Sequence, residues 1–365
     1  MVSCLRLASD VQTLYSPSGS WPKGRQMTYR IAFIGFRHGH VLSLYDAARD
    51  RDDLEIVGAC EEHAATRADL LESGRAEIAY DDADALIREI DCDIIAVGDT
   101  YARRGGMLLK ALEAGRHVIA DKPACTRLDE LARIEALAGD KQLQVGCMLT
   151  MRDSAFMRTT RRLLREGAIG EVHAIQFGGQ HPLLLGSRPA WYFEPGEHGG
   201  TINDIGIHAI DAIPWAPGQR ITRIEAARCW NAFVPESPHF GDGAQMMLRL
   251  ENGAGVLGDV SYFAPDTAGY AMPQYWRLTW SGREGVLEAG TNLPDIQLLR
   301  AGDTESEQIP LDPKGESYLD AFLASIEGRD PEEGGLTTQQ VITSSRVSLQ
   351  IQDAADKGRT AIDLD

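Results

Sequence analysis

The sequence predicts an α/β protein in two parts: a doubly wound parallel sheet, followed by an α+β part with a large, mostly antiparallel open sheet. Three observations predict this architecture. Up to about residue 150, apolar runs of strand length alternate with segments of helical periodicity. Beyond that point strand-like runs follow one another, separated by glycine-containing turns. The length of 365 residues also exceeds what one hydrophobic core usually serves.

The N-terminal part, residues 28–150, carries the alternating pattern. Strands are expected at its short apolar runs, and helices where apolar residues recur every three or four positions. Because right-handed crossovers place the carboxyl ends of such strands along one edge, a ligand is expected there. The expected strands are 30–34, 54–60, 93–97, 117–120 and 144–147, and the expected helices are 40–49, 64–72, 83–90, 106–114 and 128–138.

The C-terminal part, residues 151–365, is expected to hold the antiparallel sheet. Two turn sequences, 251–253 and 281–285, each separate adjacent strands in hairpin fashion. The last helix is a candidate for packing back on the parallel sheet. The expected strands are 171–177, 221–231, 244–250, 255–262, 275–280 and 285–289, and the expected helices are 156–166, 317–326 and 337–355.

The composition excludes several classes of partner. The chain carries 54 acidic and 36 basic residues, a net charge of −18, which disfavours nucleic acid and anionic membrane surfaces. No apolar run approaches the roughly 20 residues needed to cross a bilayer. A small molecule is the expected partner, and a local basic pocket could still bind an anion.

The cysteines and the N-terminal residues indicate in which cellular compartment the protein is expected. Six scattered cysteines form no Cys-x-x-Cys pair, and several lie in or beside apolar runs, as reduced cysteines do. We therefore expect a reducing, cytoplasmic location. Residues 1–27 are interpreted as a flexible leader without the apolar core of a signal peptide, and Met27 is a candidate native start.

A glycine turn follows the first strand and leads into a helix. Such a turn suits a pyrophosphate, because free backbone N–H groups and the helix dipole point at it. The fingerprint of dinucleotide-binding proteins is G-x-G-x-x-G, but here Arg37 stands in the second glycine position and His40 in the third. An ordinary turn is the alternative. The residues expected to hold a cofactor here are Gly35, Phe36, Arg37, His38 and Gly39.

An acidic residue follows the second strand. Glu61, about 26 residues after Gly35, can accept hydrogen bonds from both hydroxyls of an adenosine ribose, and its charge would repel a 2′-phosphate. This favours NAD over NADP. Glu62 could serve instead, or the two could form a solvated pair, and Arg37 leaves NADP open.

Two further segments contain candidate catalytic residues. Strand 117–120 ends in Asp121-Lys122-Pro123, so the ammonium of Lys122 is expected at the ligand edge, where it can stabilise a developing alkoxide. Asp204, His208 and Asp211 are spaced i, i+4 and i+7, which predicts one helix face with a carboxylate holding a general base. Alternatives are a surface lysine, a buried structural histidine, or zinc bound by His198, Asp204 and His208. No metal is the expectation.

These elements, in this order, resemble the Gfo/Idh/MocA family of oxidoreductases over about residues 28–364. The resemblance is carried by the glycine turn, by residues 111–118 running into Asp121-Lys122-Pro123, by Gly199-Gly200 through Asp211, and by residues 336–359. The family's usual Glu-Lys-Pro is Asp-Lys-Pro here. Two further departures are Arg37 in the glycine turn, and the stretch 99–104, where many relatives have Thr-Pro-Asn and a following histidine at the place of Arg104.

The resemblance implies a Rossmann domain and a second domain whose open sheet forms dimers or tetramers. It implies catalysis by Lys122, Asp204 and His208, with His208 taking a hydroxyl proton while hydride passes to the nicotinamide. The substrates it implies are sugars, cyclitols or their acids. Asp99, Thr100 and Lys122 would then join the cofactor site.

Substrate contacts are expected from Asp204, His208 and a Pro/Gly-rich loop before them. In that loop an aromatic pair beside Arg188 could line a pocket for a sugar or a sugar acid, although aromatic residues are more often packing residues. Two other functions stay open: a lyase or hydrolase that uses tightly held NAD transiently, and a non-catalytic ligand-binding relative. The further substrate-binding candidates are Arg152, His181, Trp191 and Tyr192.

Overall fold

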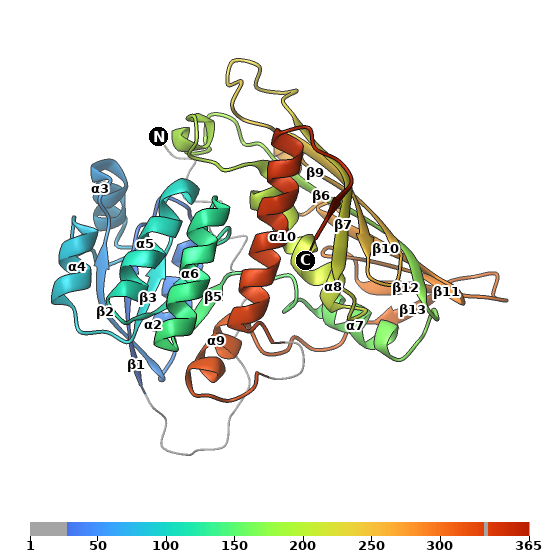
Figure 1. The fold of residues 1–365 in the computed structure, drawn as a ribbon, viewed down its shortest axis with the longest axis horizontal. Coiled ribbons are helices and arrows are strands. Elements are labelled where there is room, and N and C mark those ends of the chain that lie inside the picture. Colours follow the sequence, from blue (N-terminus) through green and yellow to red (C-terminus); the bar gives the residue numbers. More distant parts are fainter. Residues whose placement is uncertain (1–27, 332–334, 365) are drawn as a thin grey trace.

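The chain folds into two sheet layers with one long helix between them. The computed structural model describes residues 28–331 and 335–364, so the expected leader and the candidate start at Met27 lie outside it. Figure 1 shows the parallel sheet with its helices on one side, the larger sheet on the other, and α10 (Thr338–Asp356) between the two. The predicted fold class is confirmed.

The parallel sheet has five strands in the order β2-β1-β3-β4-β5. Strands β1 and β3 are neighbours although β2 lies between them in sequence, so the strand order reverses at this pair, the usual place for a ligand. The strands are β1 (Tyr29–Ile34), β2 (Leu54–Cys60), β3 (Ile94–Val97), β4 (His117–Ala120) and β5 (Val145–Cys147), and the helices are α2 (His40–Arg49), α3 (Ala64–Ser73), α4 (Ala83–Glu89), α5 (Tyr101–Glu113) and α6 (Leu128–Lys141).

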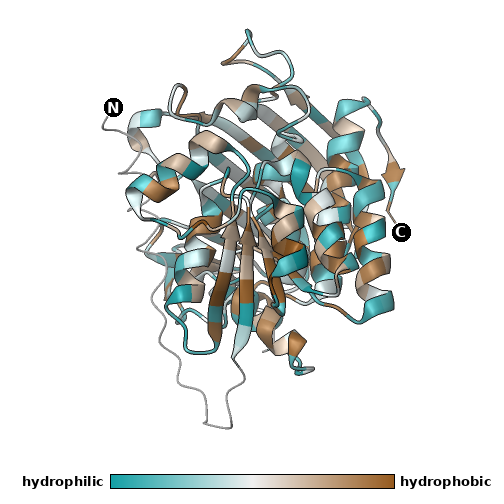
Figure 2. Cartoon of the chain, turned by 90° about the vertical axis from the view of Figure 1, so that its left-hand side faces the viewer, coloured by the Kyte–Doolittle hydropathy of each residue, from teal (hydrophilic) through white to brown (hydrophobic). Residues whose placement is uncertain are grey.

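The core of this part is closed by the C-terminal end of the chain. Brown, hydrophobic residues gather on the parallel strands in Figure 2, as expected for strands covered on both faces. Phe322 of α9 (Tyr318–Ile326) and Val341 of α10 are buried in the same core. A Cβ at Gly146 of β5 would lie 2.8 Å from the Phe322 ring, so the glycine permits this close packing.

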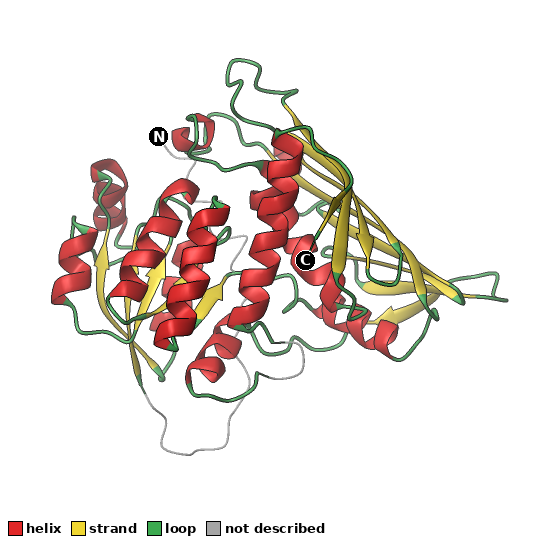
Figure 3. Cartoon of the chain, in the orientation of Figure 1, coloured by secondary structure: helices red, strands yellow, loops and turns green. Residues whose placement is uncertain are grey.

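The larger sheet has nine strands, in the order β13-β12-β11-β10-β6-β9-β8-β7-β14. It is the group of yellow arrows on the right of Figure 3. Strands β6 and β9 pair in parallel, and every other pair is antiparallel. The strands are β6 (Val172–Pro182), β7 (Ile221–Trp230), β8 (Gly243–Leu250), β9 (Gly255–Ala264), β10 (Trp276–Gly282), β11 (Gly285–Gly290), β12 (Asp295–Arg300), β13 (Glu307–Pro310) and β14 (Ile362–Asp363). Sequence reasoning did not predict the last three.

Helices cover one face of this sheet. They are α7 (Ala155–Arg165), α10, and α8 (Ile207–Trp215), which is entered through a π-helical turn at Ile202–Gly206. The opposite face shows alternating exposure along β8 and β9. None of the helices in the described ranges has both the length and the apolar character required to cross a membrane.

Candidate active site

Lys122 and Asp204 meet where the two parts of the chain touch. Lys122 follows β4, Asp204 lies in the π-helical turn, and each is 3% exposed. The Lys122 ammonium donates to the backbone carbonyl of Asp204 at 2.9 Å and forms an ion pair with its Oδ1. An ammonium has three N–H groups, so one remains for a substrate oxygen.

Three more groups surround the Asp204 carboxylate. The Tyr101 hydroxyl donates to Oδ1 at 2.7 Å, the Tyr262 hydroxyl donates to Oδ2, and His198 Nε2 lies 3.5 Å from Oδ2. Burial opposes ionisation, but Lys122 and then His198 hold the pKa of Asp204 well below its usual range. The carboxylate is therefore ionised and acts as an acceptor for both tyrosines.

His208 stands four residues after Asp204, in α8. Its half-buried ring lies edge-on to Trp276 with the ring centroids 6.2 Å apart. Within the described residues it has no hydrogen bond or ion pair. Burial, followed by the charge of Lys122, lowers the pKa of His208 to about 3. The ring is thus neutral near pH 7 and available to accept a proton.

Glu61 points back to the glycine turn. It is 1% exposed, and its two carboxylate oxygens accept from the backbone N–H groups of Phe36 at 2.6 Å and His63 at 2.7 Å. Glu62 instead pairs with Arg103 on α5. Of the two acids, only Glu61 therefore holds the turn, and its oxygens keep further acceptor capacity for ribose hydroxyls.

The glycine turn is shaped for close approach at its start. Gly35 has φ +79°, and a Cβ there would lie 2.6 Å from the Cβ of Asp99, so only glycine fits. Asp99 accepts from the backbone N–H of Thr100 at 2.7 Å and pairs with Arg103. Burial raises the pKa of both Glu61 and Asp99 above their ordinary values, and the charge of Arg37 is among the effects that oppose this shift.

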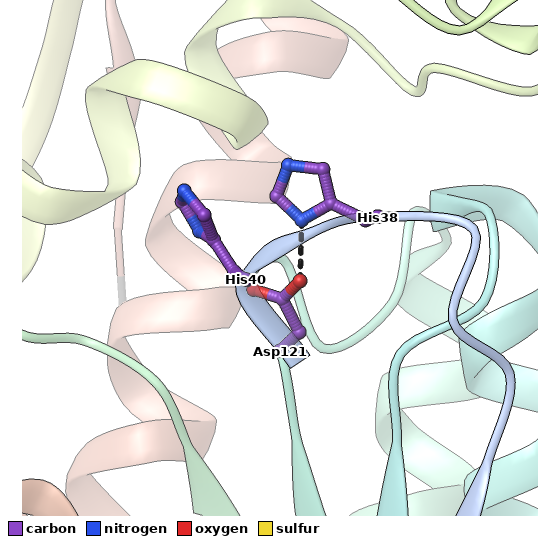
Figure 4. Close-up of side chains that lie close together, drawn as sticks. All are labelled: His38, His40 and Asp121. Atoms are coloured by element: carbon purple, nitrogen blue, oxygen red, sulfur yellow. Dashed lines mark hydrogen bonds and ion pairs between the residues drawn. The ribbon is translucent and has the colours of Figure 1, made fainter. Parts of the chain in front are cut away.

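His38 connects the glycine turn to the loop after β4 that contains Asp121 and Lys122, which we call the lysine loop (Figure 4). Its Nδ1 pairs with Asp121, and its Nε2 lies 3.1 Å from the Tyr101 hydroxyl. His40 Nδ1 lies 3.6 Å from the other oxygen of Asp121. Burial lowers the pKa of His38 to about 3 although Asp121 opposes the shift. A chain of polar contacts therefore runs from the glycine turn through Tyr101 to Asp204.

Arg104 anchors the lysine loop from within. It is fully buried, pairs with Asp121 at 3.0 Å, and donates to the backbone carbonyls of Lys122 and Pro123. The only group of three metal-type ligands found close together in the described residues is His38, His40 and Asp121, and there Arg104 already supplies the positive charge. The zinc alternative at His198, Asp204 and His208 has no such support.

The loop after β6 brings aromatic side chains to the same place. The Tyr192 hydroxyl lies 2.8 Å from that of Tyr101, and the Trp191 indole donates to the backbone carbonyl of Arg37 at 3.3 Å. His181 is 9% exposed and lies among the rings of Tyr262, Tyr275 and Trp276, and its Nδ1 is buried with no hydrogen-bond partner.

Arg152 and Asp211 lie elsewhere. Arg152 donates to both oxygens of Asp211 at 2.6 Å, and Ser344 of α10 donates to the same carboxylate. Asp211 therefore does not share the partners of Asp204, contrary to the expected single helix face, because the π-helical turn interrupts the regular spacing. Arg152 is engaged in a structural pair, and we do not retain it as a substrate ligand.

Tyr101, Tyr262 and Arg104 were not predicted as site residues. A signal existed for two of them, since the stretch 99–104, which contains Tyr101 and Arg104, departs from the pattern that the family resemblance implies. No sequence signal marked Tyr262, which reaches Asp204 from β9.

Two family models match the chain. Residues 29–148 match the oxidoreductase family with an NAD-binding Rossmann fold, and residues 157–288 match the GFO/IDH/MocA C-terminal domain. The chain belongs to the Gfo/Idh/MocA family. It is accordingly an oxidoreductase with an NAD-binding Rossmann domain.

Several known proteins are similar to this one along most of the chain. The 1,5-anhydro-D-fructose reductase of Ensifer adhaerens is 26% identical over 294 residues, covering 76% of this chain and 81% of the reductase. Inositol 2-dehydrogenase 3 of Saccharopolyspora erythraea is 24% identical over 316 residues, covering 82% and 84%. An Agrobacterium radiobacter oxidoreductase, solved with NAD+, L-tartaric acid and magnesium, has a TM-score of 0.72 at 18% identity, covering 92% and 98%.

Proposed function

We propose that this protein transfers a hydride between a secondary alcohol of a sugar-like substrate and NAD. The substrate class comprises sugars, cyclitols and sugar acids, and it agrees with the names of the reductase and inositol dehydrogenase relatives. The observation that carries the proposal is the buried ion pair of Lys122 with Asp204, four residues before His208 in the sequence. This cluster lies at the carboxyl edge of the parallel sheet, on the side of the glycine turn.

Each residue then has a role. The glycine turn and Glu61 hold the dinucleotide, which supplies the hydride acceptor when bound. His208 takes the hydroxyl proton, and the free N–H of Lys122 donates to the substrate oxygen as negative charge develops on it. Asp204 positions the ammonium of Lys122 and is itself held by Tyr101 and Tyr262. Because Glu61 is a buried acid whose charge repels a 2′-phosphate, NAD is preferred to NADP.

A cofactor and substrate screen tests the proposal. NAD and NADP are titrated by fluorescence, and sugars, inositols and sugar acids are then screened for a change in nicotinamide absorbance. We expect tighter binding of NAD and reduction of NAD by at least one polyol. Substrate cleavage without net NADH would show a lyase or hydrolase instead, and no binding at millimolar NAD would show a non-catalytic relative.

The pH dependence follows from the environment of His208. The neutral base persists down to its lowered pKa of about 3, so kcat/KM for alcohol oxidation should change little between pH 8 and 5. A histidine with an ordinary pKa of about 6.5 would lose about thirtyfold of its base form over that range. Initial rates at each pH, with recovery of activity on return to pH 8 as the stability control, measure this. An acid limb centred near pH 6.5 would contradict it.

We also propose that the outer face of the nine-stranded sheet binds a second copy of the chain. Met247 of β8 and Leu257 of β9 are cross-strand partners there, and they are 48% and 51% exposed. Ala226 and Ala227 of β7 line the same hollow, together with polar side chains of β6, β8 and β9. Paired apolar side chains at this exposure are costly in water unless a partner covers them.

Leu257→Glu should therefore dissociate the assembly. Light scattering after gel filtration is expected to give a dimer or tetramer for the wild type and a smaller species for the variant. Leu71→Glu is the matched control, because Leu71 is 55% exposed on α3, far from this face in the fold. A monomeric wild type, or an unchanged mass for Leu257→Glu, would contradict the proposed interface.

The cysteines support the proposed cytoplasmic location. Cys60, Cys92, Cys125 and Cys147 are buried and unpaired, and Cys229 is also free. Reduced thiols of this kind persist in a reducing compartment.

A further inference from the structure

Arg188 is a cation without a counter-ion. It lies in the loop between β6 and the π-helical turn and is half-buried. Its Nε donates to the carbonyl of Leu183 at 2.7 Å and its Nη2 to that of Pro182 at 2.8 Å. Among the described residues it forms no ion pair, and its Nη1 has no hydrogen-bond partner. A guanidinium has five N–H groups, so the edge formed by Nη1 and the second N–H of Nη2 is free.

This free edge is next to the reacting centre. The guanidinium lies over the ring of Tyr192 at 4.8 Å and over that of Tyr262 at 5.1 Å. Tyr262 donates directly to Asp204, and Tyr192 reaches Asp204 through the hydroxyl of Tyr101. Arg188 therefore lies against two rings that belong to the surroundings of Asp204, the carboxylate that binds Lys122.

The charges in this region do not balance. Asp204 is already paired with Lys122 through its Oδ1, and Arg188 forms no ion pair among the described residues. The site therefore has surplus positive charge, although the whole chain carries −18. Removing a guanidinium from water without an anion is unfavourable, and a bound anion offsets that cost.

His181 adds a second unused polar group. Its ring shares Tyr262 as a neighbour with Arg188, and its buried Nδ1 has no partner. A neutral imidazole can donate one hydrogen bond and accept another. It is suited to an oxygen of the same ligand, next to the anionic group.

We infer that the substrate is a carboxylate-bearing polyol, a sugar acid, whose carboxylate pairs with Arg188 while its reacting hydroxyl faces Lys122 and His208. The free guanidinium edge presents two parallel N–H groups, the geometry that a carboxylate accepts best. A neutral sugar or inositol would leave the cation unpaired. This inference rests on the proposed function and selects one substrate class within it.

Matched substrate pairs test the inference. D-Gluconate against D-glucitol and D-glucuronate against D-glucose differ mainly in the carboxylate. We expect wild-type kcat/KM to be at least tenfold higher for the acid of the pair that is turned over. Arg188→Gln should lower kcat/KM for that acid by about a hundredfold, mainly through KM, and should bring the acid-to-neutral ratio near one. Arg188→Lys should retain part of the preference for the acid, because lysine keeps the positive charge but lacks the two parallel N–H donors of a guanidinium.

Two controls separate the possible failures. Arg283→Gln removes an exposed arginine from the β10–β11 turn and should change neither substrate. The NAD dissociation constant of Arg188→Gln should equal the wild-type value, which excludes misfolding. If neutral substrates are preferred, or if Arg188→Gln lowers both members of a pair equally, the inference is wrong.

Binding by itself provides an independent readout. Calorimetry of D-gluconate and D-glucuronate with the NADH-loaded protein measures acid binding without turnover, and Arg188→Gln should abolish the heat. If no substrate at all is oxidised while acid binding still depends on Arg188, the proposed function fails and the anion site stands. If neither acid binds, the anion site fails even where turnover of neutral polyols is observed.

Discussion

His208→Ala is expected to lower kcat for alcohol oxidation by roughly a thousandfold, within the range found for removal of a general base. The half-buried His208 ring has no hydrogen bond or ion pair in the described residues, so its loss leaves no polar group unpaired. Since His208 is not among the groups that hold the glycine turn, the NAD dissociation constant should stay unchanged. Single-turnover rates and an NAD titration measure the two effects separately.

His173→Ala is the matched control for this variant. His173 is an exposed histidine on β6, and its loss should leave kcat at the wild-type value. If His208→Ala retained more than a tenth of wild-type kcat, His208 would not be the base.

The fold was predictable where apolar runs are continuous and bounded by turns. Strands 54–60 and 117–120 and helix 40–49 have the same bounds in the structure as in the sequence analysis. Helix α5 begins at Tyr101, five residues before the predicted start. Its first turn contains Arg104, which looks solvent-exposed in the sequence but is fully buried by its ion pair with Asp121. Hydrophobic periodicity cannot identify a buried face that is made of charge.

The strands that were missed have different causes. β12 and β13 form the edge of the large sheet, where polar side chains dilute the alternating pattern, and β14 is only two residues long. Such strands depend on the neighbouring strand for their stability rather than on their own sequence.

The site was partly predictable for a related reason. Lys122 and Asp204 were predicted from local motifs, and the structure joins them. Tyr101 and Tyr262 reach Asp204 across 103 and 58 residues, so no local pattern relates them to it. For Asp211 the local pattern was misleading. Its spacing from Asp204 predicted a shared helix face, but the π-helical turn gives Asp211 other partners.

Those partners make Asp211 central to the stability of the C-terminal part. Arg152 is 5% exposed and Asp211 is fully buried, and two hydrogen bonds of 2.6 Å join them. The Ser344 hydroxyl donates to the same carboxylate at 2.7 Å, so the pair also ties α10 to α8. A buried ion pair of this kind adds little stability compared with well-packed apolar residues. Loss of one member, however, leaves the other as an unpaired buried charge.

Arg152→Met should therefore lower the free energy of unfolding by about 3–5 kcal/mol. Urea denaturation followed by circular dichroism measures this effect. Arg127→Ala, which breaks the exposed pair with Asp129 on the surface of the parallel-sheet part, should leave the free energy of unfolding nearly unchanged. The double variant Arg152→Met/Asp211→Leu should recover most of the loss, because no uncompensated charge remains. If the double variant were less stable than Arg152→Met alone, burial of an unpaired carboxylate would not be the cause, and the loss would instead reflect packing of the Arg152 side chain against Trp215.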